Sequence, residues 1–310
     1  MILRAFEVLF SPFGPSSNNT RIRTGKQRGE SMQAYRIAVA LLVVFALPVS
    51  AGAAPIVFEG FGADATAIQS SVDGFRAALG NPNNGNVPGP LPSGRREINW
   101  DGGGDATTVS PTPFTGFLNT RGALFTTPGT GFVQAPPSGG PQGGLATLFN
   151  NPTYSAFDTF SAPRLFTPIG GTLTNVTFFT PGTSGGLAAN VTGFGAVFSD
   201  VDFAGSATLT FVNAGGVSLG TFSVPPANDG LSFLGLIFPG ELIGQINIIS
   251  GNSPLGPNDG FGVDIVLMDD FLYSEPSPVP EPATLLLFGT TAACLGLARW
   301  RQHKRNQQQP

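Results

Sequence analysis

The chain has 310 residues, of which 43 are Gly and 28 are Pro, and only 11% are charged. This composition is poor in helix formers and rich in turn formers, so it predicts an all-β fold. Between residues 55 and 280 there are five Arg against sixteen Asp and Glu, a formal charge of −11. Such a charge argues against nucleic acid and anionic lipid as partners of this segment, and it favours cations.

Cys, His and Lys occur only near the ends of the chain. The single Cys is Cys294, the single His is His303, and the two Lys are Lys26 and Lys304. The segment between the ends has no His, Cys or Lys. It therefore cannot form a Ser-His-Asp or Cys-His site, a His or Cys zinc site, or a Lys Schiff base. No disulfide can stabilise it.

The N-terminus predicts export. Residues 1–31 are polar and irregular, and we interpret them as disordered or as preceding the true start at Met32. Residues 32–54 contain Arg36, a short apolar run and a small-residue end, which is typical of a signal peptide for the secretion machinery, cleaved after Ala53 or Ala54. The alternative is an uncleaved N-terminal anchor.

Residues 55–274 predict one exported β-sandwich domain. A first strand is expected at 56–61. One short amphipathic helix should follow, because apolar residues recur at helical spacing, with Asp64 or Thr66 as N-cap and Gly80 just past the end. Its apolar residues are Ile68, Val72, Phe75 and Leu79.

Short apolar runs separated by turn residues predict the remaining strands. Expected strands before residue 190 are 122–126, 131–134, 145–149, 164–167 and 173–180, and the Thr-Pro-Gly-Thr turn at 127–130 suggests a hairpin. Those after it are 191–203, 207–213, 217–224, 231–238, 242–250 and 261–273. Their regular spacing favours a jelly-roll-like sandwich of about eight strands.

Two pairs of acidic residues stand out in these strands. Period two places Asp200 and Asp202 on one strand face, which we interpret as an exposed strand end. Asp269 and Asp270 interrupt an apolar strand, and alternation predicts that Asp269 shares the face of Phe271 while Asp270 takes the other.

The first and last strands, with Phe58-Glu59-Gly60 and Met268-Asp269-Asp270-Phe271, resemble the matching ends of jelly-roll carbohydrate-binding modules. That resemblance implies a structural calcium ion held by Glu59 and Asp270, with Asp269 as a third ligand. The alternative is that these carboxylates are solvated or paired with Arg.

Trp100, beside Asp101 in a Gly-rich segment, is a candidate platform for stacking on a sugar ring. The alternative is that its large ring fills the core.

The C-terminus predicts a membrane anchor with a sorting signal. Residues 275–282 form a Pro-rich stalk that ends in the box Pro280, Glu281 and Pro282. Residues 283–298 carry no charge and would extend about 24 Å as a helix, just enough to cross a bilayer with flanking help. The basic tail at 299–310 should stay cytoplasmic by the positive-inside rule.

This order of box, apolar span and basic cluster resembles the PEP-CTERM sorting signal of Gram-negative bacteria. The resemblance implies that an exosortase recognises Pro280, Glu281 and Pro282, with Arg299 and Arg301 behind the span. The precursor would be anchored in the inner membrane and then cleaved near the box, so that the body is released or re-anchored at the cell surface or in the extracellular matrix. The alternative is a plain C-terminal anchor.

Three functions are consistent with these features. The first is a non-enzymatic surface or matrix protein in contact with exopolysaccharide, a link that the sorting-signal resemblance implies. The second is specific glycan binding, and the third is a glycosidase that uses two carboxylates, the one hydrolase class that the residue inventory permits.

Overall fold

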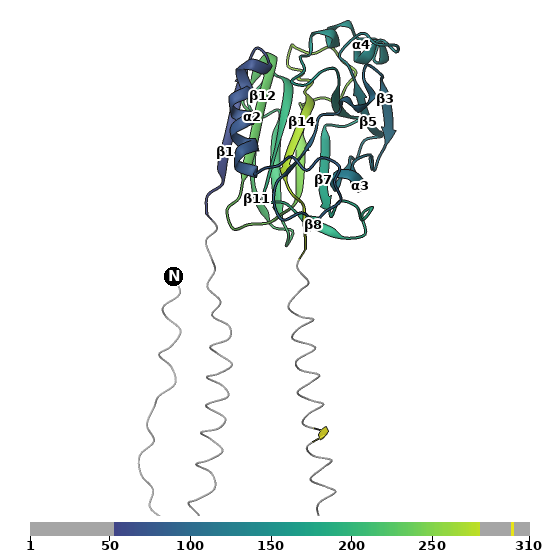
Figure 1. The fold of residues 1–310 in the computed structure, drawn as a ribbon. Helices are drawn as coiled ribbons and strands as arrows, with labels where there is room; N and C mark the ends of the chain where they lie inside the picture. The colour runs from purple at the N-terminus through teal and green to yellow at the C-terminus, as the bar shows by residue number, and fades with distance from the viewer. Residues whose placement is uncertain (1–52, 280–298, 301–310) are drawn as a thin grey trace, which may run out of the picture. The chain divides into compact units, whose positions relative to one another are not determined.

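The computed structural model describes residues 53–279 and 299–300. The described chain forms two antiparallel β-sheets, which confirms the all-β prediction (Figure 1). One sheet of eight strands has the order β1-β12-β9-β14-β6-β5-β3, with β2 also paired to β14. The other, of seven strands, has the order β11-β10-β13-β7-β8-β15, with β4 also paired to β7.

Strands supply most of the regular structure. The first sheet contains β1 (Ile56–Gly62), β2 (Arg95–Ile98), β3 (Thr108–Pro111), β5 (Gly131–Ala135), β6 (Leu165–Ile169), β9 (Gly193–Val201), β12 (Ala227–Ile237) and β14 (Leu267–Ser274). The second contains β4 (Ala123–Thr126), β7 (Leu173–Phe179), β8 (Ala188–Asn190), β10 (Thr208–Asn213), β11 (Ser218–Ser223), β13 (Ile243–Ile249) and β15 (Ser277–Pro278). The helices are α2 (Ala65–Leu79), α3 (Leu118–Arg121) and α4 (Gly144–Leu148), with 3₁₀ turns η1 (Asp101–Gly103) and η2 (Pro152–Ala156).

The main core lies between the two sheets. It draws on strands of both, including β9 and β14 from one and β7, β10 and β13 from the other. In β7 the buried positions alternate with more exposed ones, as expected of a strand with one covered face. In β9 and β14 every residue is buried, because a second layer covers their other face.

Helix α2 forms part of that second layer, packing against β1, β12 and β14 (Figure 1). The Asp64 carboxylate accepts a hydrogen bond from the Ala67 N–H at 3.1 Å, and Gly80 ends the helix at a φ of 105°. All four apolar residues predicted for its inner face are buried. A Cβ on Gly195 or Gly235 would lie within 3.0 Å of the Phe75 ring, so these two glycines allow the helix to approach the sheet closely.

Two local predictions were wrong. Residues 145–149, expected as a strand, lie mostly in α4, because a five-residue apolar run does not distinguish a strand from a single helical turn. The turn at 127–130 joins no hairpin, since β4 pairs with β7 of the second sheet while β5 pairs with β3 and β6 of the first.

The C-terminal boundary of the domain also lies further along the chain than predicted. Glu275 is 6% exposed, and β15 pairs with β8, so the first half of the predicted stalk belongs to the folded body. Across the described residues, 53–279 and 299–300, no helix is both long enough and apolar enough to span a membrane. The predicted signal peptide at 32–54, except Ala53 and Ala54, and the predicted span at 283–298 lie outside those residues.

A buried ion pair connects this C-terminal segment to β2. Arg96 is 0% exposed, and its Nε and Nη2 each donate to a Glu275 carboxylate oxygen at 2.7 Å. Its Nη1 donates to the carbonyl oxygens of Gly85 and Thr120, and Asn84 donates to Glu275 as well. The pair therefore joins the end of the body to the loop that precedes β2.

Replacing Arg96 with Met should lower the free energy of unfolding by about 3–5 kcal/mol, because Glu275 would stay buried without a charged partner. Denaturant unfolding of the full chain measures the change. The double variant Arg96→Met/Glu275→Leu is the control and should recover most of the loss. Equal losses in the single and double variants would show that the ion pair is not the cause.

Candidate functional site

Asp269 and Asp270 lie together in a β-bulge of β14. Met268 pairs with Phe198 and Phe271 with Ala196, so the two aspartates stand opposite the single residue Val197. Both Met268 and Phe271 face the main core. The bulge thus breaks the simple alternation predicted for this strand. As a result both carboxylates lie close to the hydroxyl group of Ser161. Ser161 Oγ lies 3.2 Å from Asp269 Oδ1 and 2.7 Å from Asp270 Oδ1.

Asp269 has a structural role. It is 0% exposed, and its Oδ2 accepts hydrogen bonds from the backbone N–H groups of Phe160 at 2.7 Å and Ser161 at 3.2 Å. Burial and the adjacent charge of Asp270 raise the pKa of Asp269 well above its usual range. Its carboxyl group therefore holds the segment around residue 160 against the sheet.

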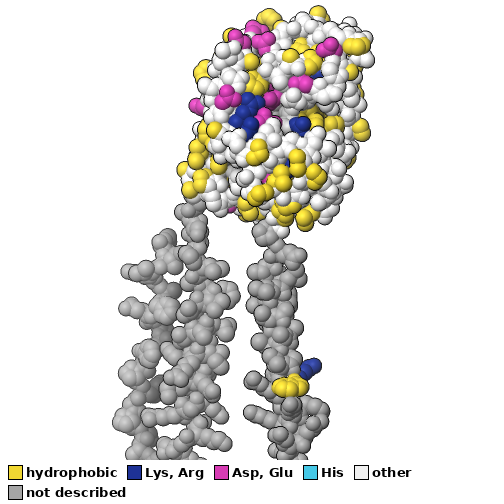
Figure 2. Space-filling view, viewed as in Figure 1, with side chains coloured by type: hydrophobic (Ala, Val, Ile, Leu, Met, Phe, Trp, Pro, Cys, Tyr) yellow, Lys and Arg dark blue, Asp and Glu magenta, His cyan; other side chains and the backbone are white. Residues whose placement is uncertain are grey.

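Asp270 faces a pocket that we call the polar pocket. Its volume is about 250 Å³, and it is lined by Arg76, Asn83, Glu97, Asn99, Arg121, Ser161 and Asp270. Figure 2 shows basic and acidic side chains gathered side by side on this face, in the region between α2 and β14. The lining comes from helix, strand and loop segments that are far apart in the sequence.

Charges are balanced inside the polar pocket. Arg76 Nη2 lies 3.0 Å from Glu97 Oε2 and 3.6 Å from Asp270 Oδ2. Burial raises the pKa of Asp270 to about 6, although the Ser161 hydroxyl and the Arg76 charge oppose the shift. Both carboxylates of the lining are therefore already paired with the same guanidinium group.

Arg121 supplies the second positive charge. Its Nε donates to Asn86 Oδ1 at 3.1 Å, and its guanidinium carbon lies 5.3 Å from the centre of the Phe117 ring. Partial burial lowers the pKa of Arg121. No ion pair between described residues includes Arg121. With two guanidinium groups, two carboxylates, two amides and a hydroxyl, the polar pocket offers donors and acceptors to an uncharged, hydroxyl-rich ligand.

The predicted calcium site is not assembled. Glu59 lies on β1, which is separated from β14 by β12 and β9, so three strand spacings put Glu59 roughly 14 Å from the Asp270 strand. Glu59 is exposed, whereas Asp269 and Asp270 are buried. The three residues therefore cannot bind one ion, and the Arg-paired alternative holds for Asp270.

Trp100 is a core residue, so its interpretation as a sugar platform was wrong. The residue is 0% exposed, and its ring stacks on Phe166 with centroids 3.7 Å apart and planes 2° apart. The rings of Phe117, Phe125 and Phe271 meet it edge-on. Its Nε1 donates to the Asp269 carbonyl oxygen at 2.9 Å, so the polar atom is satisfied inside the core.

Replacing Trp100 with Ala should lower the free energy of unfolding by about 3–5 kcal/mol, because a large buried ring is removed. Phe61→Ala is the control, since Phe61 is 62% exposed and its loss should change stability by about 0.5 kcal/mol or less. Chemical denaturation of both variants measures the difference. Similar small changes in both would contradict a core role for Trp100.

A second group of acids forms what we call the acidic cluster: Asp200, Asp202 and Asp259, with one carboxylate oxygen of each within 4.8 Å of the others. Asp200 is 6% exposed, so the sequence-based interpretation as an exposed strand end was wrong for this residue. Burial, with the charges of Asp259 and Asp202, raises the pKa of Asp200 to about 7. Burial, with the charges of Asp259 and Asp264, raises that of Asp202 to about 6.

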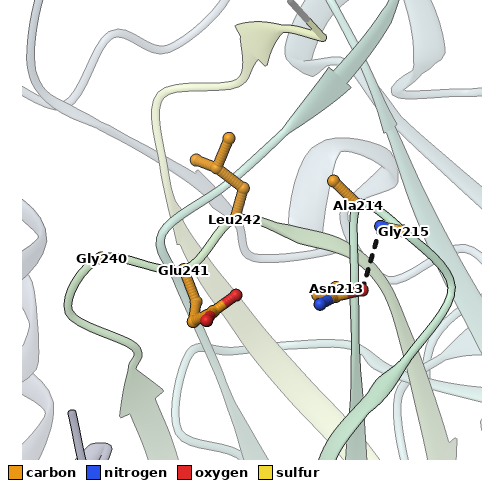
Figure 3. Close-up of a pocket in the computed structure, with 6 residues that line it drawn as sticks. All are labelled: Asn213, Ala214, Gly215, Gly240, Glu241 and Leu242. Atoms are coloured by element: carbon orange, nitrogen blue, oxygen red, sulfur yellow. Dashed lines mark hydrogen bonds between the residues drawn. The ribbon is translucent and has the colours of Figure 1, made fainter. Parts of the chain in front are cut away.

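A shallower hollow of about 240 Å³ lies between two turns, at Asn213–Gly215 and Gly240–Leu242 (Figure 3). The Asn213 Oδ1 accepts hydrogen bonds from the N–H groups of Gly215 and Val217, both at 2.9 Å. Its side chain thus shapes the turn. Of the six described lining residues only Glu241 is charged, so no group of functional side chains converges here.

Comparison with known families identifies the C-terminal segment. Residues 278–302 match the family model of the PEP-CTERM protein-sorting motif. A search of curated proteins gave no match. The chain therefore carries the sorting motif that its sequence predicted, and the match contains Pro280, Glu281, Pro282, Arg299 and Arg301. Such a motif supports an exported protein that is processed at the membrane by an exosortase.

The site residues that no sequence pattern indicated all come from segments that are distant in the sequence from their partners. Arg76, Glu97, Asn99, Arg121 and Ser161 meet Asp270 only through the tertiary fold. Asp259 likewise reaches Asp200 and Asp202 from a different loop. An unusual number of acids around β14 was visible in the sequence, but their partners were not.

Proposed function

We propose that this chain is an exported, non-enzymatic protein of the cell surface or extracellular matrix that associates with exopolysaccharide. The observation that carries the proposal is the PEP-CTERM sorting motif at residues 278–302. In this proposal residues 32–54 direct export and residues 283–298 anchor the precursor in the inner membrane. The exosortase then acts at the box formed by Pro280, Glu281 and Pro282.

Replacing Glu281 with Ala tests the sorting step. The variant should accumulate as an unprocessed precursor in the producing cells, because the box loses its only charge. Immunoblots with a C-terminal tag measure the loss of the tail over time. Glu59→Ala, at an exposed position of β1, is the control and should mature at the wild-type rate. Maturation of Glu281→Ala at that same rate would contradict recognition of the box.

The polar pocket supports contact with a polysaccharide. Sugar hydroxyls both donate and accept hydrogen bonds, and the pocket presents both kinds of partner with balanced charge. A fold alone does not establish what a protein binds, so this part of the proposal rests on the lining residues.

Replacing Asn99 with Ala tests this contact. The Asn99 side chain is exposed at the pocket and makes no hydrogen bond to another described residue, so the substitution should leave stability nearly unchanged. Losing hydrogen bonds to sugar hydroxyls should weaken binding to exopolysaccharide from the producing cells about five- to tenfold, as measured by co-sedimentation of the full chain.

Asn228→Ala is the matched control, since Asn228 is also exposed but lies outside the polar pocket. It should bind like the wild type. Equal binding by both variants and the wild type would exclude the polar pocket as the polymer site.

A glycosidase is a weaker candidate. It needs one carboxyl group free to protonate the leaving oxygen and a second free to act as base or nucleophile. Glu97 and Asp270 are both ion-paired with Arg76, which favours binding over hydrolysis.

A further inference from the structure

The acidic cluster lies where the end of β9 meets the loop that leads into β14. Asp200 and Asp202 stand at the C-terminal end of β9, and Asp259 stands in the loop. Backbone groups fix two of the three carboxylates. Asp200 Oδ1 accepts from the Asp229 N–H at 2.7 Å, and Asp259 Oδ1 accepts from the Ile265 N–H at 2.7 Å. Each of these carboxylates keeps a second oxygen for another partner.

A fourth aspartate provides an independent observation. Asp264 is 0% exposed, and its Oδ2 accepts hydrogen bonds from the N–H groups of Asp202 and Phe203, both at 3.2 Å. Its Oδ1 is buried and has no hydrogen-bond partner among the described residues. The Oδ1 of Asp202 is also buried, and no described residue donates a hydrogen bond to it. Buried carboxylate oxygens without partners are costly, so this region lacks a positive group that would compensate them.

No basic side chain fills that role within the described part of the chain. Its ion pairs all involve Arg76, Arg95 or Arg96, and none includes a member of the acidic cluster or Asp264. This contrasts with Asp270 and Glu275, which each have an arginine. The missing positive charge is therefore expected to come from outside the described residues.

We propose that Asp200, Asp202 and Asp259 bind one calcium ion, and that Asp264 supports the site through its hydrogen bonds to the backbone of Asp202 and Phe203. Calcium binds oxygen ligands at about 2.3–2.6 Å, so two oxygens on one ion lie up to about 5 Å apart. The spacing within 4.8 Å meets this condition. Magnesium needs near-ideal octahedral geometry at about 2.0–2.1 Å, and zinc prefers His and Cys, which the body lacks.

A bound ion would stabilise the junction between two central strands. Both β9 and β14 are buried along their whole length, and they pair with each other. The ion would attach the loop around Asp259 to the end of β9.

The test uses the purified full chain, first treated with EDTA and then dialysed. Isothermal titration with calcium chloride should show one site. Calcium at ten times the Kd should raise the thermal unfolding midpoint by about 3–6 °C, and magnesium at the same concentration should raise it much less. Asp202→Asn should lose the response to calcium. In EDTA its midpoint should equal or exceed that of the wild type, because one of several repelling charges is removed.

Asp73→Asn is the matched control, since Asp73 is an exposed carboxylate on α2 that should not affect the response. Asp259→Asn provides a second variant on a different segment and should behave like Asp202→Asn. A wild-type chain without a calcium response would overturn the proposal. So would an unchanged response in both variants, or an equal response to magnesium.

Discussion

The central strand β14 is buried along its whole length, yet the chain places four carboxylates in it and at its ends. Each of them must be compensated, because an unpaired charge in the interior is costly. Glu275 is paired with Arg96, Asp270 with Arg76, and Asp269 with two backbone N–H groups. Asp264 also accepts two backbone N–H groups, but one of its oxygens has no partner among the described residues.

The aromatic core and this polar network are connected. Trp100 stacks on Phe166 inside the core, and its ring N–H donates to the backbone of Asp269 in the β-bulge. The bulge in turn directs Asp270 toward Arg76 and the polar pocket. Packing of the rings therefore positions a buried carboxylate beside the polar pocket, and the position of the pocket depends on residues that no ligand could touch.

Local patterns were sufficient to predict some elements and insufficient for others. Helix α2 was predictable, because its apolar period, its Asp64 cap and its Gly80 end are all encoded within one segment. The strands β9 to β13 of the C-terminal half were predictable from alternation and turn residues, whereas the strand predicted at 261–273 begins only at Leu267. The bulge at Asp269 was not, because it depends on how β14 pairs with β9. Two further contacts were not predictable: Arg96 pairs with Glu275, and Asp259 approaches Asp200. Both join distant segments, and the pattern within one segment carries no information about such contacts.

The last strand of the body has a consequence for the fate of the exported protein. Ser277–Pro278 pairs with β8. Just before this strand, Glu275 accepts two hydrogen bonds from Arg96. A covalent cut anywhere beyond Val279 would therefore leave every one of these contacts in place. The body would retain its fold whether it stays attached to the cell or diffuses away. A cut before Glu275, in contrast, would leave Arg96 buried without its counter-charge and would expose the interior to water.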